Sequence, residues 1–165
     1  MRYSPVLTTL GFVLSEDATA VLMIEDTRPG SYGFGKWNGL GGKVAPDEDV
    51  VTGMRREIHE ESGLTALELR LRGTVSWPGF GPDGEDSFGF CFVVDRWEGT
   101  PLTESAEGRL DWVPVADLLA DPPRLDLWPG DRYFLPLVFG ADERQFHGVL
   151  PYHDGRPTGW SHTWV

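Results

Sequence analysis

Three closely spaced glutamates are the residues of this sequence best suited to chemistry. Glu57, Glu60 and Glu61 are related by i, i+3 and i+4, which places them on one face of a helix. Three carboxylates held this close repel one another by about 1 kcal/mol per pair in water, and by several times more where solvent is partly excluded. A divalent cation would reverse the sign of that interaction. The spacing by itself is also typical of a solvated acidic helix face, so the flanking residues must decide between the two.

The segment around these glutamates predicts a loop followed by a single helix. Residues 46–49, Pro-Asp-Glu-Asp, are a helix-start signal, because acidic side chains are favoured near the N-terminal end of the helix dipole. We expect the helix to end near Ser62, because Gly63 is suited to the left-handed conformation that follows a helix end. The side chains on the neighbouring face should pack against a sheet, and they are Val51, Met54 and Ile58.

The remaining elements are mostly strands. Apolar runs predict strands at 7–14, 20–24, 67–77, 88–94 and 110–115, and a closing pair at 145–152 and 159–165 around the Asp154-Gly155 turn. Short helices are predicted at 115–119 and 131–139, loops at 26–36 and 97–107, and a glycine-rich extended piece at 37–43. We therefore expect one α+β domain over residues 1–165, with a single mixed sheet and a helix on each side.

Composition limits the classes of partner. The formal net charge of −12 argues against a surface that clamps polymeric DNA or RNA, but a small anionic substrate remains compatible if a cation bridges it to the protein. Cys91 is the only cysteine, so no internal disulfide forms, and its neighbours Phe90 and Phe92 indicate a buried thiol. No apolar run approaches the roughly 20 residues that span a bilayer, and no secretory signal is evident. We expect a cytoplasmic protein that binds no membrane.

The residues around the glutamates follow a known pattern. Gly42 is followed after five residues by Glu48, and after seven more by residues 56–64, Arg-Glu-Ile-His-Glu-Glu-Ser-Gly-Leu. Every specified position of the Nudix signature is filled, so the chain resembles the Nudix hydrolase family. The resemblance implies a Nudix-type α/β/α sandwich with a central mixed sheet.

The resemblance also implies a metal site. It assigns Mg²⁺, or Mn²⁺, to the carboxylates of Glu57, Glu60 and Glu61, with Gly42 completing the expected ligand set, and it makes Arg56 and Glu48 a brace between loop and helix. An all-oxygen, carboxylate-rich site suits hard cations that share phosphate oxygens with a substrate. No cluster of Cys and His side chains indicates zinc.

Three further segments resemble the branch of the family that hydrolyses oxidised purine nucleoside triphosphates. They are residues 33–43, the Glu-Gly-Thr-Pro run at 98–101, and residues 127–133. Carried over, Asn38, Trp128 and Asp131 contact the purine. Each also has an ordinary structural explanation in a turn, a core or a helix end. Trp77 is a further stacking candidate, and Lys43 is a candidate phosphate contact.

One position departs from that branch. Related enzymes carry two acids after the Trp-Pro pair, whereas this chain has Gly130 and then Asp131. One carboxyl is therefore missing from the inferred base pocket. This leaves open the choice between 8-oxo and 2-oxo purines, and between oxidised and normal bases.

The expected reaction is hydrolysis of a nucleoside triphosphate to a monophosphate and pyrophosphate. Glu60 or Glu61 is favoured as the general base, with Glu107 on the downstream loop as another candidate. Two alternatives stay open: a Nudix enzyme that acts on ADP-ribose or another nucleoside diphosphate derivative, and a nucleotide-binding module without catalysis. A monomer and a homodimer are both compatible with the sequence.

Overall fold

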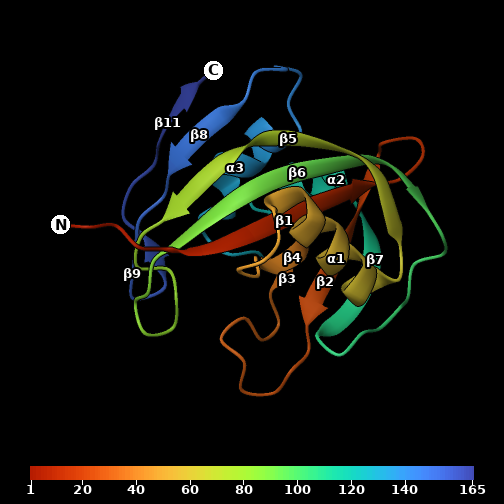
Figure 1. Cartoon of the computed structure of the whole chain (residues 1–165), viewed down its shortest axis with the longest axis horizontal. Coiled ribbons are helices and arrows are strands. Elements are labelled where there is room, and N and C mark those ends of the chain that lie inside the picture. The colour runs from red at the N-terminus through yellow and green to blue at the C-terminus, as the bar shows by residue number, and fades with distance from the viewer.

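The computed structural model describes all 165 residues and contains one large mixed sheet with helices on both faces. Nine strands form this sheet: β1 Val6–Leu14, β2 Ala20–Asp26, β3 Trp37–Asn38, β4 Leu40–Lys43, β5 Thr65–Trp77, β6 Ser87–Glu98, β7 Gly108–Pro114, β8 Phe146–Val149 and β11 Ser161–Trp164. A separate hairpin joins β9 Tyr152–His153 to β10 Arg156–Pro157. The helices are α1 Val50–Ser62, α2 Val115–Leu119 and α3 Asp131–Val138. Figure 1 shows α1 in front of the sheet, with α2 and α3 behind it.

The sheet divides along one edge of β1. On its other edge β1 runs parallel to β6, which is antiparallel to β5, and β5 in turn is parallel to β8. Along the divided edge, β4 pairs with Thr8–Gly11 and β2 pairs with Val13 and Leu14. The glycine-rich strand β4 therefore lies directly beside the first half of β1.

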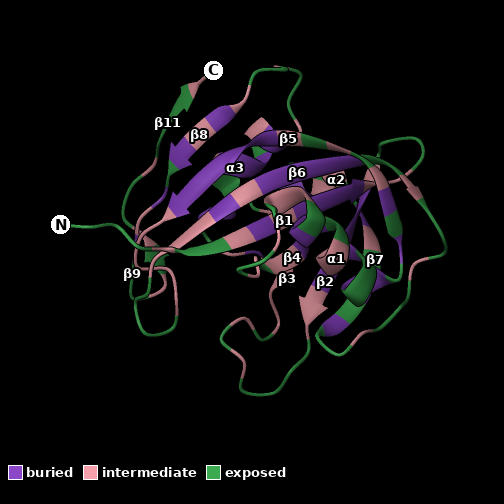
Figure 2. Cartoon of the chain, in the orientation of Figure 1, coloured by how far each residue is buried: buried purple, intermediate pink, exposed green.

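Two apolar layers hold the helices to the sheet. Alternate side chains of β6 point to opposite faces, so Cys91 and Val93 join the core on the α3 side, while Phe92 and Val94 join the core on the α1 side. Buried residues run along β5, β6 and β1 in Figure 2. The predicted α+β class and the mixed sheet are confirmed, and Cys91 is buried as expected.

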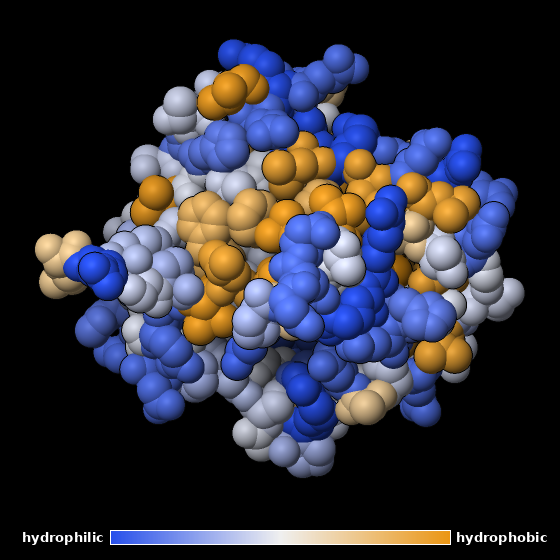
Figure 3. Space-filling model, in the orientation of Figure 1, coloured by the Kyte–Doolittle hydropathy of each residue, from blue (hydrophilic) through white to orange (hydrophobic).

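Helix α1 has the bounds that its local signals predict. The Asp49 carboxylate caps the start by accepting from the amides of Val51 and Thr52, both at 2.9 Å. Gly63 ends the helix with a φ of 77°, in the left-handed region. Met54 and Ile58 are fully buried against the sheet. Hydrophilic side chains gather over α1 in Figure 3, beside apolar side chains of the neighbouring strands.

The C-terminal region differs from its prediction. The expected strand 145–152 is interrupted at Leu150-Pro151, because proline has no amide hydrogen to continue a ladder. Two hairpins result: β8 pairs with β11, and β9 pairs with β10 around Asp154 and Gly155. The predicted loop 97–107 also begins later, because β6 continues to Glu98. None of the helices is long and apolar enough to cross a membrane.

Candidate active site

The carboxylate edge of α1 lies against the backbone of β4. The Gly41 amide donates to Glu61 Oε1 at 3.0 Å. A Cβ atom at Gly42 would lie 2.6 Å from Glu57 Oε1, so only glycine lets that carboxylate approach the strand so closely. Glu60 is more exposed, at the outer edge of the same face. The three glutamates therefore line the seam between helix and strand.

Arg56 connects this edge to the preceding loop. Its guanidinium donates to both Glu48 oxygens, at 2.9 and 2.6 Å, and to the Lys43 carbonyl at 3.2 Å. The same group donates to Glu57 Oε1 at 2.9 Å and to Glu60 Oε2 at 3.2 Å. Since the planar guanidinium can serve several acceptors at fixed angles, one side chain orients carboxylates from both the loop and the helix.

Burial and mutual repulsion favour protonation of the inner glutamates. Burial raises the pKa of Glu61 to about 9, and the negative charge of Glu107 adds to this, while the Gly41 amide opposes it. Burial also raises the pKa of Glu57, against the opposing effect of Arg56. The ionised forms therefore lack sufficient positive charge nearby, and a bound cation would supply it.

The donor set of this edge suits a hard divalent cation, although the side chains do not already enclose one. No three Asp, Glu, His or Cys side chains are close enough together to hold a metal ion. Glu57 and Glu60 instead point toward Arg56. Carboxylate oxygens and backbone carbonyl oxygens are the kinds of ligand that hard divalent cations take in proteins, and the glutamates of α1 and the backbone at Gly42 offer both kinds. In each of the Glu57 and Glu60 carboxylates one oxygen accepts from Arg56, which leaves the other oxygen available to a cation.

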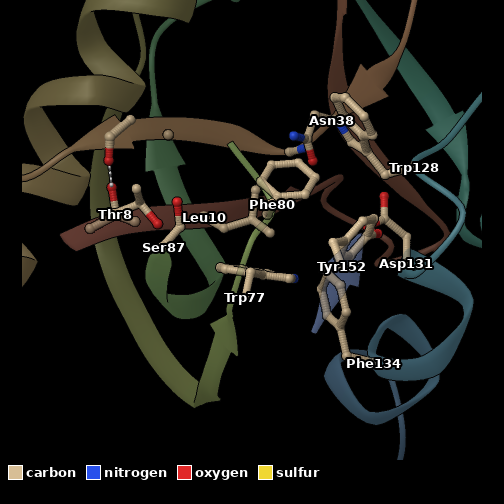
Figure 4. Close-up of a pocket in the computed structure, with 14 residues that line it drawn as sticks. Thr8, Leu10, Asn38, Trp77, Phe80, Ser87, Trp128, Asp131, Phe134 and Tyr152 are labelled. Atoms are coloured by element: carbon tan, nitrogen blue, oxygen red, sulfur yellow. Dashed lines mark hydrogen bonds between the residues drawn. The ribbon is translucent and has the colours of Figure 1, made fainter. Parts of the chain in front are cut away.

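An aromatic pocket opens on the other side of β4. It encloses about 210 Å³ and brings together Asn38, Trp77, Trp128 and Asp131, four residues that the sequence singled out as substrate contacts. In Figure 4, Asn38 and Trp128 lie at one side, with Trp77 across the cavity and Asp131 at its end. The pocket therefore combines flat apolar walls with an amide and a carboxyl, the groups needed to stack a base and to read its edge.

Several residues that line the pocket were not predicted from the sequence. Phe80 meets Trp128 edge-on, with ring centroids 4.8 Å apart, and meets Tyr152 in the same way at 4.9 Å. Tyr32, on the loop after β2, does not line the pocket but supports it, because its hydroxyl donates to the Phe80 carbonyl at 2.9 Å. The remaining unpredicted lining residues include Thr8, Leu10, Ser87 and Phe134. These residues are scattered along the chain, so their spacing forms no motif that would predict a shared pocket. Isolated aromatic residues such as Phe80 and Tyr152 are ordinarily core residues.

Asp131 is a buried acid at the end of this pocket, with 8% of its surface exposed. Burial raises its pKa to about 7, although the Trp128 backbone and the charge of Lys36 act in the opposite direction. Near neutral pH the carboxyl is therefore partly protonated, and it offers a ligand both a donor and an acceptor.

A second, polar pocket of about 180 Å³ adjoins the first. The two pockets share Asn38, Gly39, Gly41 and Trp128. The polar pocket adds Glu61 and Glu107 from the carboxylate side, together with two cations that the sequence did not indicate, Arg28 and Lys36.

Both cations are held by acids. Arg28 pairs with Asp26 at 3.0 Å, and Lys36 pairs with Asp126 at 2.7 Å and lies 5.8 Å from the Trp128 ring centre. Lys43 lines neither pocket, and its backbone carbonyl accepts from Arg56. The positive charge facing the polar pocket therefore comes from the loop after β2.

Comparisons with known proteins agree on one family. The model of the NUDIX domain matches residues 5–138. An oxidized purine nucleoside triphosphate hydrolase of Mus musculus is 38% identical over 124 residues, covering 74% of each chain, and one of Danio rerio is 34% identical over 125 residues, covering 74% of this chain and 75% of its own. A crystal structure of the MutT protein from Bacillus halodurans superposes with a TM-score of 0.80 at 25% identity, over 95% of this chain and 97% of its own.

Proposed function

The chain belongs to the Nudix hydrolase family, and we propose that it hydrolyses a purine nucleoside triphosphate, with an oxidised purine as the favoured base, to the monophosphate and pyrophosphate. The names of its relatives in mouse and zebrafish support this choice of substrate. The reaction uses small-molecule nucleotides and a divalent cation, with Mg²⁺ proposed first and Mn²⁺ second.

The observation that carries this proposal is the continuity of the two pockets. A base in the aromatic pocket contacts Asn38, Trp128 and Asp131, and Asn38 and Trp128 also line the polar pocket that Glu61 and Glu107 reach. A nucleotide whose base occupies the first pocket therefore extends its phosphates into the second. A purine suits the aromatic pocket and a phosphate chain suits the polar pocket. The two pockets meet along Gly39 and Gly41 of the β3–β4 segment.

The residues divide the chemistry among them. Glu57, Glu60 and Glu61, with the backbone at Gly42, hold the cation, and Arg56 and Glu48 keep this group oriented. When bound, a divalent cation neutralises phosphate charge and orients the attacking water. Arg28 and Lys36 add positive charge along the phosphates, and Lys43 is a further phosphate contact in this proposal. Trp77 stacks on the base from the opposite wall.

The proton of the attacking water passes to a carboxylate near the polar pocket. The candidates for this role are Glu60 and Glu61 on α1 and Glu107 on the loop before β7. Glu61 and Glu107 line the polar pocket together, and the charge of Glu107 acts on Glu61. Glutamine substitutions at each position, compared through pH profiles of kcat, identify which carboxylate is the general base, because protonation of that base causes the loss of activity at low pH.

The test is formation of the nucleoside monophosphate in the presence of Mg²⁺ from 8-oxo-dGTP, 2-oxo-dATP, dGTP and ADP-ribose. The triphosphates should release pyrophosphate as the second product, whereas ADP-ribose would release ribose 5-phosphate. We expect turnover of the triphosphates, and a loss of at least about a hundredfold in kcat for Glu60→Gln, with the fold unchanged by circular dichroism. Glu16→Gln, in the exposed turn between β1 and β2, is the matched control. Full Mg²⁺-dependent activity in Glu60→Gln contradicts the site, and a preference for ADP-ribose contradicts the substrate class.

A further inference from the structure

Gly130 is packed directly against the hydroxyl of Tyr152, a residue that lines the aromatic pocket. Gly130 precedes α3, and its amide donates to the Tyr152 hydroxyl at 2.9 Å. A Cβ atom at position 130 would overlap that hydroxyl and would lie 2.8 Å from Leu150 Cδ2. The space that a side chain at position 130 would need is therefore filled by the tyrosine from β9.

The Tyr152 hydroxyl retains a free hydrogen-bond donor. A phenol has one donor hydrogen and can also accept. Here the oxygen accepts from Gly130, and its hydrogen is donated to no other protein group. Tyr152 is only 6% exposed, yet it lines the aromatic pocket beside Asp131. Figure 4 shows these two side chains together at the same end of the cavity. A ligand in the pocket is the remaining acceptor for this hydrogen.

The backbone around Tyr152 holds the hydroxyl in place. The Tyr152 amide donates to the Pro78 carbonyl at 2.8 Å, and the Leu150 amide donates to the Ser76 carbonyl at the same distance. The edge contact with Phe80 restricts the ring from the side. A donor fixed in this way cannot move to suit a ligand, and it therefore discriminates between ligands that present an acceptor and ligands that do not.

We propose that Tyr152 is a specificity-determining residue, whose hydroxyl donates to a carbonyl oxygen on the purine edge beside Asp131 and so favours 6-oxopurines over 6-aminopurines. The proposal rests on the nucleotide-binding role of the pocket proposed above. A 6-amino group at the same place would direct its own hydrogens toward the tyrosine donor. Because the phenol oxygen already accepts from Gly130, the hydroxyl is better placed to donate to a ligand than to accept from one.

The test is the selectivity of Tyr152→Phe. With Mg²⁺, kcat/KM is measured for dGTP against dATP and for 8-oxo-dGTP against 2-oxo-dATP. We expect the variant to lose about five- to tenfold on the 6-oxopurines, the worth of one neutral hydrogen bond, and to keep its activity on the 6-aminopurines. An equal loss on all four nucleotides, or an unchanged selectivity ratio, overturns the proposal.

Two further variants separate selectivity from folding. Tyr133→Phe removes a hydroxyl that is bonded to Arg132 and lies outside both pockets, so its selectivity ratio should equal that of the wild type. Gly130→Ala displaces the Tyr152 hydroxyl and should reduce selectivity to the same extent as Tyr152→Phe. Because both changes remove one donor, the double variant should show no further loss of selectivity, and additive losses contradict the coupling.

A binding assay separates this proposal from the proposed function. Trp77 and Trp128 line the pocket, so dGMP and dAMP can be titrated by tryptophan fluorescence without catalysis. If the wild type hydrolyses none of the triphosphates, the proposed function fails, while the role of Tyr152 is still decided by binding. Wild type should prefer dGMP by a larger factor than Tyr152→Phe, and equal factors overturn the role of Tyr152.

Discussion

At the scale of single residues, the site places two kinds of acid in two different surroundings. Glu57 and Glu61 lie beside other carboxylates and within reach of Arg56 or a backbone amide. Asp131 lies alone among aromatic walls, and its raised pKa comes from burial. The first group is suited to a cation, and the second to a neutral hydrogen bond with a base. This separation matches the two chemistries that the proposed nucleotide substrate would require.

Asp131 should make stability depend on pH. Its pKa is raised from 3.8 to about 7 in the folded protein, so the folded form binds the proton more tightly than the unfolded form. The stabilisation that comes from this raised pKa is fully present below about pH 4 and is lost as pH rises toward 7. Above pH 7 the group is ionised in both forms, and stability no longer changes with its titration. The loss is of the order of 4 kcal/mol at most.

Asp131→Asn, which cannot ionise, tests this contribution. Urea unfolding of wild type and variant at pH 5 and pH 8 should show a smaller decline for the variant. Equal declines would mean that Asp131 is already ionised at pH 5.

Gly42→Ala should impair catalysis without unfolding the protein. A methyl group there would press on the Glu57 carboxylate, which already lies against the strand. We expect a loss of at least about tenfold in kcat from this displacement. Gly159→Ala, where the nearest atom to a new Cβ is 3.9 Å away, is the matched control, and both variants are assayed by pyrophosphate release. Wild-type activity in Gly42→Ala would remove Glu57 from the proposed metal site.

At the scale of elements, helix α1 depends on its first cap. The Asp49 side chain accepts from two backbone amides and from the Thr52 hydroxyl. Asp49→Ala should lower the free energy of unfolding by about 1 kcal/mol, while Asp49→Asn should retain most of the cap. Chemical denaturation measures both, and an unchanged midpoint for Asp49→Ala would show that packing of Met54 and Ile58 alone fixes the start of the helix.

The same helix explains what could be predicted from sequence. Asp49, Gly63 and the apolar spacing of Met54 and Ile58 are local signals, so the predicted bounds of α1 and its predicted buried face agree with the structure. Phe80 follows β5 and Tyr152 follows β8, and these two strands, far apart in the chain, pair in the sheet, so no local rule brings the two residues together. The break at Pro151 was readable from proline chemistry, but the strand pattern on either side obscured it.

At the scale of the whole molecule, the acidic composition leads us to expect that divalent cations stabilise the protein. With a net charge of −12 and several carboxylates at the site, Mg²⁺ should stabilise the folded form, because it binds that form preferentially. We expect about 10 mM Mg²⁺ to raise Tm above its value in EDTA, and to raise it further than KCl does at the same ionic strength. Glu57→Gln/Glu60→Gln should lose this excess, and an equal gain with KCl would indicate general screening.

The base pocket is assembled from almost the full length of the chain. It takes Thr8 and Leu10 from β1 at one end and Tyr152 from β9 at the other. On the ribosome, the carboxylate helix can form early, but the last pocket wall emerges only after the strands beyond residue 145. Nascent chains should therefore gain nucleotide affinity late and abruptly, when β8 joins β5 and brings Tyr152 to Gly130. If the proposed function holds, the order of synthesis should delay base recognition until the rest of the fold is in place.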